Sequence, residues 1–446
     1  MSAARPSPRL LLALAILPIA SVAVSACSGS APPIDPTVGK NPDLPPPETS
    51  LLPTVNIAPA NRWAAGELPT AAPGLRVNAF ATGLDHPRWL YVLPNGDLLV
   101  AETNAPPRPA EGGGIRGWVM EKVMQRAGAA VPSANRIRLL RDTDSDGVAD
   151  VQAAFLENLN SPFGMFLSGN DLYVANTDAL LRFHYEPGAT TLTGPGEHIA
   201  ELPAGPLNHH WTKNVIGDPD GERLYVTVGS NSNVGENGME KEEYRAAILS
   251  VDPRTGELEV FANGLRNPNG LAWNPESGAL WTTVNERDEL GDNLVPDYMT
   301  SVEAGGFYGW PYSYFGQHVD ERVKPQRPDL VAKARVPDYA LGAHTASLGL
   351  DFYAHDLFPA RYRNGAFVGQ HGSWNRSELS GYKVVFVPFA NGEPNGPPED
   401  ILTGFVNEDG EARGRPVGVV TAADGALLVA DDVGNVIWRV VPESVD

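Results

Sequence analysis

The chain has 446 residues, of which 42% are hydrophobic and 20% are charged. Its 54 acidic side chains outnumber the 33 basic ones, which gives a formal charge of −21. This composition is too apolar and too aromatic for a disordered protein, and the acidic excess argues against nucleic acid as a partner. The 46 glycines and 41 prolines indicate many turns, and therefore many short strands.

The first residues have the pattern of an export signal. Arg5 and Arg9 precede an apolar run, Leu10–Val24, that is too short to span a bilayer. Cys27 is the only cysteine, so an intramolecular disulfide and any multi-cysteine metal site are excluded. Because Val-Ser-Ala-Cys resembles a bacterial lipobox, we expect residues 1–26 to be a lipoprotein signal peptide and Cys27 to carry lipid. An ordinary secretory signal beside an incidental cysteine is the alternative.

A proline- and alanine-rich stretch follows the cysteine. Residues 27–72 sustain no helix or strand period, and clusters such as Pro45-Pro46-Pro47 are typical of extended linkers. We therefore expect a tether between the lipid anchor and a folded catalytic domain at 73–446. The protein is then exported and held at the bacterial cell envelope, on the periplasmic or cell-surface side, with no other attachment to the membrane.

One pattern recurs six times in the folded part. A short polar segment leads into an apolar strand, a turn of Gly, Asn or Asp, and a second apolar strand. The copies begin at His86, Ser161, His209, Asn267, Ala346 and Arg415. A spacing of roughly 60 residues suits a four-stranded blade with its loops, so the sequence predicts an all-β protein with a six-bladed β-propeller.

The same pattern predicts how the ring closes. The run Leu75–Phe80 is expected to pair with Val436–Val440, which would hide two sheet edges. The longer segments between copies, such as 104–135 and 285–345, are expected to be loops on a rim.

Polar side chains stand where the copies lead into their first strands. Equivalent positions of successive blades surround the mouth of the central channel, so His210, Arg266, Asn267, Arg413 and Arg415 should converge. Histidine titrates near neutral pH and can accept a proton from a substrate. Several arginines facing one pocket of an acidic protein require an anionic ligand, and guanidinium groups bind carboxylates through two hydrogen bonds. We therefore expect a ligand that bears several carboxylates.

These residues resemble those of the soluble quinoprotein sugar dehydrogenases, in particular the sorbosone dehydrogenase and aldose sugar dehydrogenase group. The resemblance extends from about residue 74 to 440, and its most specific stretches are 264–272 (GLRNPNGLA) and 305–311 (GGFYGWP). Members of this family are six-bladed propellers that use pyrroloquinoline quinone (PQQ), a tricarboxylate, together with calcium. The spacing of His210 from the Pro219-Asp220-Gly221 turn matches that of the family's catalytic histidine.

The resemblance implies a role for each position. His210 would be the general base that accepts a hydroxyl proton while hydride passes to PQQ. Arg266 and Asn267 would hold the quinone oxygens, and Arg413 and Arg415 would bind the carboxylates or stack on the cofactor plane.

Two calcium ions are implied in the same way. The backbone carbonyls of Asp288 and Glu289 would contact the calcium that also bridges PQQ. Asp297 and the Tyr308 carbonyl would hold a second, structural ion. Calcium prefers several oxygen ligands, and the loop 285–298 is rich in them.

The sequence departs from the family pattern in four places, one of which is the loop 285–298, longer than in the glucose-oxidising branch. His209 replaces an aspartate that often precedes the catalytic histidine, and could itself be the base or alter the pKa of His210. A glutamine expected at the second repeat is absent, and Asn160-Ser161-Pro162 stands there. The family's lysine near the cofactor carboxylates is replaced, in our interpretation, by Arg376 or His371. These changes bear on sugar specificity more than on cofactor use.

A second calcium-like pattern lies outside the repeats. Residues 142–147 (DTDSDG) resemble the start of an EF-hand loop, but the twelfth position is Ala153 instead of glutamate. The run could bind an ion or form an Asx-rich turn.

We therefore predict an enzyme that oxidises a sugar or sugar aldehyde with PQQ and passes electrons to an external acceptor. A calcium-dependent lactonase-like propeller would instead need carboxylate and amide ligands from several blades around one metal. A non-catalytic binding propeller would have no affinity for PQQ. The histidine and arginines before the first strands favour the dehydrogenase.

Overall fold

The computed structural model describes residues 1, 35–49, 54–107, 126–128 and 130–443. The chain divides into residues 1–34 and 35–446, and the second unit contains the fold. The predicted signal peptide at 1–26 and the lipidation site Cys27 lie outside the described residues. In the described part of the chain, no helix is long and apolar enough to cross a membrane.

Six antiparallel sheets, each built on four main strands, form the fold. The first three consist of β4 (Pro87–Val92), β5 (Leu98–Glu102), β6 (Arg136–Arg141) and β7 (Val151–Leu156); β8 (Met165–Ser168), β9 (Asp171–Ala175), β10 (Ala179–His184) and β11 (Glu197–Glu201); and β12 (Val215–Gly217), β13 (Leu224–Val228), β14 (Ala247–Val251) and β15 (Leu258–Asn263).

The other three sheets follow in chain order and include the strand that closes the ring. They consist of β16 (Pro268–Trp273), β17 (Leu280–Val284), β18 (Pro296–Ser301) and β21 (Tyr339–Ala343); β22 (Ser347–Tyr353), β23 (Gly365–Gln370), β24 (Lys383–Ala390) and β26 (Glu399–Thr403); and β27 (Pro416–Thr421), β28 (Leu427–Asp431), β29 (Val436–Pro442) and β3 (Leu75–Thr82).

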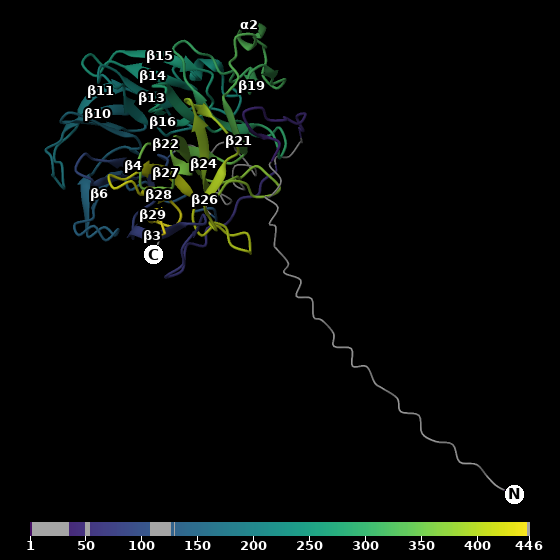
Figure 1. Ribbon diagram of the computed structural model, residues 1–446. Helices are drawn as coiled ribbons and strands as arrows, with labels where there is room; N and C mark the ends of the chain where they lie inside the picture. Colours follow the sequence, from purple (N-terminus) through teal and green to yellow (C-terminus); the bar gives the residue numbers. More distant parts are fainter. Residues whose placement is uncertain (2–34, 50–53, 108–125, 129, 444–446) are drawn as a thin grey trace. The chain divides into compact units, whose positions relative to one another are not determined.

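The sheets are the blades of a six-bladed β-propeller, as the sequence predicts. The first strands contact one another in the cyclic order β4, β8, β12, β16, β22, β27 and back to β4. In Figure 1 the labels of β4, β16, β22 and β27 lie toward the middle, and those of β11, β15 and β3 lie toward the outside. The predicted closure is confirmed, because β3 pairs antiparallel with β29.

Glycines in the first strands allow the blades to meet around the axis. A Cβ atom on Gly349 would lie 2.4 Å from the Val417 carbonyl oxygen, and one on Gly418 would lie 2.7 Å from the Arg88 carbonyl oxygen. Gly164, directly before β8, and Gly270 in β16 meet backbone atoms of the neighbouring blade in the same way. Each of these glycines therefore lets the backbones of two neighbouring blades approach closely. The second strands bury apolar side chains on both faces, as in Leu98–Glu102.

The segment 35–72 differs from the tether that the sequence predicts. Within its described residues, β1 (Val38–Gly39) pairs with β21 and β2 (Thr70–Ala71) pairs with β26. Ala58 is 1% exposed, and Trp63 packs edge-to-face on Phe405 and Trp438. The prediction is therefore wrong for residues 35–49 and 54–72, because β1 and β2 extend the outer edges of the fourth and fifth blades and apolar side chains of this segment pack on the propeller.

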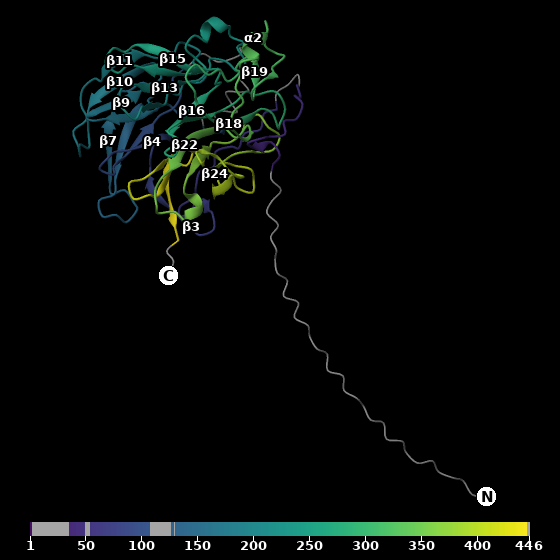
Figure 2. The same cartoon turned by 45° about the horizontal axis from the view of Figure 1, so that its top comes forward.

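A long insertion between β18 and β21 projects at the outer edge of the molecule (Figures 1 and 2, upper right). It contains β19 (Ser313–Tyr314), β20 (His318–Val319) and α2 (Pro328–Val331). The buried Arg287 guanidinium fixes it through the Pro311 and Ser313 carbonyls at 2.9 and 2.7 Å.

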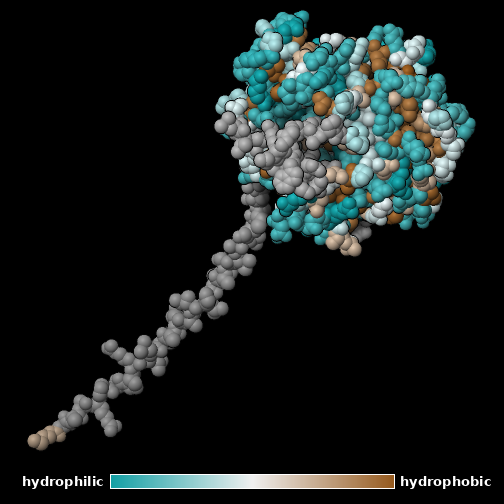
Figure 3. Space-filling view, turned by 180° about the vertical axis from the view of Figure 1, so that it is seen from behind, coloured by the Kyte–Doolittle hydropathy of each residue, from teal (hydrophilic) through white to brown (hydrophobic). Residues whose placement is uncertain are grey.

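The remaining short elements are η1 (Met239–Lys241), η2 (Ala360–Tyr362) and β25 (Glu393–Pro394). On the face shown in Figure 3, hydrophilic side chains predominate and apolar ones are scattered among them.

Candidate active site at the mouth of the propeller

The predicted site residues gather at one end of the propeller. The start of each first strand pairs with the end of the second strand, as in Pro87 with Glu102 and Pro416 with Asp431. This end is termed the mouth. Residues at the mouth either precede a first strand or follow a second strand. The site residues predicted from the sequence that precede first strands are His210, Arg266, Asn267, Arg413 and Arg415. Those that follow second strands are Asp288, Glu289 and Arg376.

His210 is fixed against the loop that follows β13. Its Nδ1 atom lies 2.8 Å from the Ser230 carbonyl oxygen and 3.1 Å from Ser230 Oγ. Because a carbonyl oxygen only accepts, Nδ1 carries the proton in the neutral ring and the lone pair lies on Nε2. The His209 ring stands edge-on to the His210 ring, with centroids 4.6 Å apart. The two adjacent histidines therefore share one part of the mouth.

Asn267 lies beside His210 across a glycine. A Cβ atom on Gly229 would lie 2.4 Å from both Asn267 Oδ1 and His210 Cβ, so only glycine leaves room for both side chains. Asn267 is 8% exposed, and its Oδ1 atom has no hydrogen-bond partner. A buried polar atom without a partner is costly, and a bound ligand could supply that partner.

Arg266 is buried and held by protein acceptors. Its Nη1 atom donates to the Glu286 carbonyl at 2.7 Å, and its Nη2 atom donates to Asn233 Oδ1 at 2.9 Å and Asp288 Oδ2 at 3.2 Å. Burial raises the pKa of Asp288, but the hydrogen bond from His344 and the charge of Arg266 lower it overall. In this arrangement Arg266 orders the loop after β17, and Asp288 stays ionised.

A buried charged cluster lies between the first, fifth and sixth blades. The Asp432 carboxylate accepts from Arg88 Nη1 at 2.9 Å and contacts His371 Nε2 at 2.9 Å, and His86 Nε2 lies 3.5 Å away. Arg415 Nη1 reaches the His371 carbonyl at 3.5 Å. The Arg88 guanidinium also lies 5.8 Å from the Trp211 ring, next to His210. We name His86, Arg88, His371, Arg415 and Asp432 the mouth cluster.

The mouth cluster has more positive than negative charge. It contains two guanidinium groups and one carboxylate, that of Asp432, which pairs with Arg88. Burial raises the pKa of this carboxylate, but the neighbouring histidines and Arg88 lower it overall. Burial lowers the pKa of His86 to about 4 and also lowers that of His371, so both rings are neutral at pH 7. The Nε atoms of Arg88 and Arg415 and the Oδ1 atom of Asp432 have no hydrogen-bond partner. The cluster can therefore accept an anionic group.

The N-terminal segment contacts two of the predicted arginines. Arg415 Nη2 donates to the Ala58 carbonyl at 3.0 Å, and its guanidinium lies 4.7 Å from the Tyr382 ring. Arg413 is more exposed and lies 5.8 Å from the Trp63 ring, with Glu67 3.7 Å from its Nε.

Arg376 has a different side-chain partner. It donates to Asn293 Oδ1 at 3.0 Å, and its Nε atom is buried without a partner. All three of these arginines lie at the mouth, but their surroundings differ.

The atoms implied for calcium have other partners. The Asp288 carbonyl accepts from Arg322 Nη1 at 2.8 Å and from Asn233 Nδ2 at 3.3 Å, and the Glu289 carbonyl lies 3.4 Å from the same Arg322 nitrogen. Nitrogen donors already point at these oxygens, so the residues do not fit a calcium ion in this arrangement.

The second implied calcium set is also not assembled. Asp297 accepts from the Glu286 and Ser347 amides and from the Thr345 hydroxyl, all between 2.8 and 2.9 Å. The Tyr308 hydroxyl donates to the Ser301 carbonyl at 2.7 Å, and the described contacts do not bring Tyr308 to Asp297. Burial raises the pKa of Asp297 to about 6.

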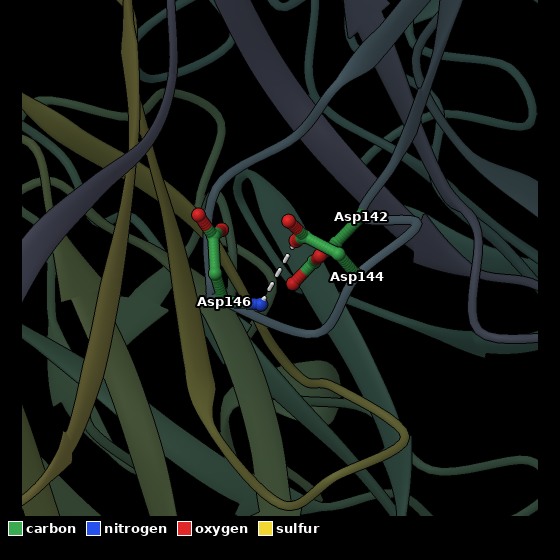
Figure 4. A group of neighbouring side chains, drawn as sticks. All are labelled: Asp142, Asp144 and Asp146. Carbon is green, nitrogen blue, oxygen red and sulfur yellow. Dashed lines mark hydrogen bonds between the residues drawn. The ribbon is translucent and has the colours of Figure 1, made fainter.

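The DTDSDG run does bring three carboxylates together. Asp142, Asp144 and Asp146 each place an oxygen within 4.8 Å of the others (Figure 4). The loop is already ordered by local hydrogen bonds, such as Gly147 N to Asp142 Oδ2 at 2.8 Å, so its geometry also suits an Asx-rich turn.

The sequence interpretation missed Arg88, Asp432 and Arg322. In the first repeat (His86-Pro87-Arg88), His86 is the residue that aligns with Asn267 and Arg415, each directly before the proline that begins a first strand. Arg88 lies two residues later, inside β4, so the repeat did not single it out. Asp432 follows the second strand of the sixth blade and is 344 residues from Arg88. Arg322 belongs to an insertion without a repeat.

Residues 70–440 match the family described as "Domain of unknown function (DUF7133)". The chain belongs to this family. It is 31% identical over 304 residues to an uncharacterized protein of Borreliella burgdorferi, covering 65% of this chain and 78% of that protein. The description of the family names no activity, whereas some of the more distant relatives are named as enzymes.

Two relatives with named activities use sugars. The chain is 30% identical over 264 residues to the aldose sugar dehydrogenase of Escherichia coli, covering 55% of this chain and 63% of that protein. It is 26% identical over 430 residues to the PQQ-dependent pyranose dehydrogenase of Coprinopsis cinerea, covering 82% of this chain. The match spans 54% of that fungal protein.

Solved structures confirm the fold. The holo form of the Coprinopsis cinerea pyranose dehydrogenase PQQ domain superposes with a TM-score of 0.68 at 21% identity, covering 86% of this chain and 100% of that one. The PQQ-bound aldose sugar dehydrogenase of Streptomyces coelicolor gives a TM-score of 0.56 at 16% identity, covering 84% and 100%.

Proposed function

We propose that the protein is a quinoprotein dehydrogenase that oxidises a sugar or a sugar aldehyde at the mouth and passes the electrons to an external acceptor. The observation that carries this proposal is the mouth cluster beside His210. It is a buried site with more cationic than anionic groups and with polar atoms that lack partners, in a chain of charge −21. The relatives named as PQQ-dependent or aldose sugar dehydrogenases support the same activity.

The residues of the mouth suit a planar ligand with several carboxylates. Arg88 and Arg415 have buried Nε–H groups without acceptors, and His371 lies between them. Guanidinium groups match carboxylates in shape and charge. These residues, with Arg376 and Arg413 nearer the solvent, would hold the carboxylates of PQQ, and Asn267 would face one of its other polar atoms. When bound, PQQ supplies the acceptor for a hydride from the substrate carbon.

His210 performs the proton transfer in this proposal. The Ser230 carbonyl fixes the tautomer with hydrogen on Nδ1, which makes Nε2 the atom that accepts the substrate hydroxyl proton. Gly229 lets the Asn267 amide approach His210, so the base and the ligand contact are positioned together. Trp211 links the base to the mouth cluster through Arg88. His209 remains the alternative base.

The alternative lactonase-like reaction would need metal ligands from several blades. In the described part of the chain, the group of three possible metal-binding side chains lies at Asp142, Asp144 and Asp146, in the loop between β6 and β7. The mouth cluster has a single carboxylate among cationic and neutral groups. This distribution favours an anionic ligand over a catalytic metal.

The experiment is a titration of PQQ into protein that lacks residues 1–27, followed by dye reduction with a panel of aldoses and sugar aldehydes. We expect saturable binding and sugar-dependent reduction. His210→Ala should lower the reduction rate by about 10²–10⁴-fold, as for loss of a general base, and change PQQ affinity less than about twofold. His198→Ala, whose side chain is 48% exposed on β11, is the matched control. Absence of PQQ binding would overturn the proposal.

We also propose that the mature protein is exported and anchored through lipid on Cys27. The sequence around Cys27 supports this. Metabolic labelling with a fatty acid should mark the wild-type protein and leave Cys27→Ser unlabelled. Labelling of both proteins, or of neither, would contradict the anchor.

A further inference from the structure

We propose that Arg322 takes the place expected for calcium, so that PQQ binds at the mouth without this metal. The inference rests on the proposed function. It starts from the Arg322 guanidinium, which lies against the two carbonyl oxygens that the resemblance assigns to calcium, at 2.8 Å from that of Asp288 and 3.4 Å from that of Glu289.

The orientation of Arg322 is set by a buried carboxylate. Its Nε and Nη2 atoms donate to the two oxygens of Asp320 at 2.9 and 2.8 Å. This paired geometry uses one edge of the planar guanidinium, and the remaining Nη1 atom faces the carbonyls. The Arg322 side chain is 23% exposed, so it borders both the protein interior and the solvent.

Asp320 is itself fixed from a second side. It is 1% exposed and lies 3.2 Å from Nη1 of the fully buried Arg287. Burial alone would raise the pKa of Asp320, but the hydrogen bond from Arg322 and the two guanidinium charges lower it. The carboxylate therefore stays ionised and keeps Arg322 in position. The insertion that contains Arg322 is tied to Arg287 through the Pro311 and Ser313 carbonyls.

The surroundings of these carbonyls are unsuitable for calcium. Calcium requires six to eight oxygen ligands at about 2.3–2.6 Å. Two nitrogen donors, Arg322 Nη1 and Asn233 Nδ2, already point at the Asp288 carbonyl. The Asp288 carboxylate is engaged by Arg266 and His344. A calcium ion here would lie among N–H donors and positive charges.

A guanidinium supplies what the metal would supply to an anionic ligand. It offers positive charge and directed hydrogen bonds to oxygen atoms, and it remains protonated throughout the physiological pH range. Because Arg322 is a covalent part of the chain, this positive charge is permanent. PQQ affinity should therefore be independent of calcium.

The test measures PQQ binding by the change in quinone absorption, with millimolar calcium or with millimolar EDTA. The wild-type affinity should be equal in the two conditions, within about twofold. Arg322→Ala should weaken binding by about tenfold or more in EDTA, the loss expected for a charged hydrogen-bond donor, and calcium should restore part of the affinity. Arg322→Lys keeps the positive charge but lacks the planar fork of the guanidinium, so it separates the effect of charge on PQQ affinity from the effect of the directed hydrogen bonds.

The control variant is Arg327→Ala. This arginine belongs to the same insertion, its side chain is 49% exposed, and it pairs with the exposed Asp329. Affinity rather than calcium content is measured, because the Asp142 loop could bind calcium independently. Wild-type protein that binds PQQ only with calcium would overturn the inference and leave the proposed function intact. Failure to bind PQQ in both conditions would overturn both.

Discussion

Trp63 provides a direct test of the N-terminal segment as part of the propeller. Its Nε1 atom donates to Asp431 Oδ2 at 2.7 Å, and its ring lies 5.5 Å from Phe405 and 5.3 Å from Trp438 between centroids. A hydrogen bond to an ionised group contributes about 1.5–3 kcal/mol, and an edge-to-face ring pair adds about 0.5–1.5 kcal/mol. Trp63 is half-buried, so values at the lower ends apply.

We therefore expect Trp63→Phe to cost about 1.5 kcal/mol of local opening free energy, for the lost hydrogen bond, and Trp63→Ala about 2.5 kcal/mol, for the hydrogen bond and both ring pairs. Since 1.4 kcal/mol is a tenfold change, amide hydrogen exchange over residues 54–72 should be faster by about 10-fold and about 60-fold, respectively. Hydrogen exchange with mass spectrometry measures this.

The matched control is Leu68→Ala in the same segment, where the wild-type leucine is 48% exposed. This change should leave the exchange of residues 54–72 close to that of the wild type. Equal exchange in Trp63→Ala and Leu68→Ala would refute the reasoning and restore the tether interpretation.

Three further predictions concern the mouth and the axis. Gly229→Ala places a Cβ atom 2.4 Å from His210 Cβ and Asn267 Oδ1. The base should be misplaced, and kcat should fall about 10²-fold. An unchanged kcat in steady-state assays would contradict the close contact of Gly229 with His210 and Asn267. Burial lowers the pKa of His86 from 6.5 to about 4. The folded state therefore favours the neutral ring, and this contribution to the free energy of unfolding is complete above pH 6.5. It is lost as the pH falls through about 4, by up to about 3 kcal/mol. The thermal midpoint of the wild type relative to His86→Asn should fall between pH 7 and 4, and a difference independent of pH would be evidence against a neutral buried ring. Gly349→Ala puts a Cβ atom 2.4 Å from the Val417 carbonyl oxygen, which should destabilise the fold by about 1–3 kcal/mol; thermal unfolding with an unchanged midpoint would rule out close contact between the first strands.

The blades could be predicted from the sequence because their pattern is local. Each copy joins a polar start, an apolar strand and a turn within about 20 residues, and six copies fix the ring. The converging positions followed from the same periodicity, which is why His210, Arg266 and Asn267 lie at one end of the molecule as expected. Pairing of β3 with β29 was predictable because an unpaired edge is unfavourable.

The remaining features depend on contacts between distant residues. Asp432 meets Arg88 across 344 positions, and Ala58 accepts from Arg415 across 357. The two short strands of the N-terminal segment could not be predicted from its proline- and alanine-rich sequence, because they form only by pairing with β21 and β26. The insertion that carries Arg322 has no repeat to align, so the proposed replacement of the calcium ion by a guanidinium had no sequence signature.

The central claim is that a sugar reduces PQQ at the mouth, and one anaerobic measurement tests it most directly. Protein loaded with one equivalent of PQQ is mixed with an aldose or a sugar aldehyde, and the quinone absorption is followed without any added acceptor. We predict complete loss of the quinone band at one sugar per PQQ, and a much slower loss in His210→Ala. A quinone band that persists with every aldose and aldehyde, although PQQ is bound, would contradict the dehydrogenase.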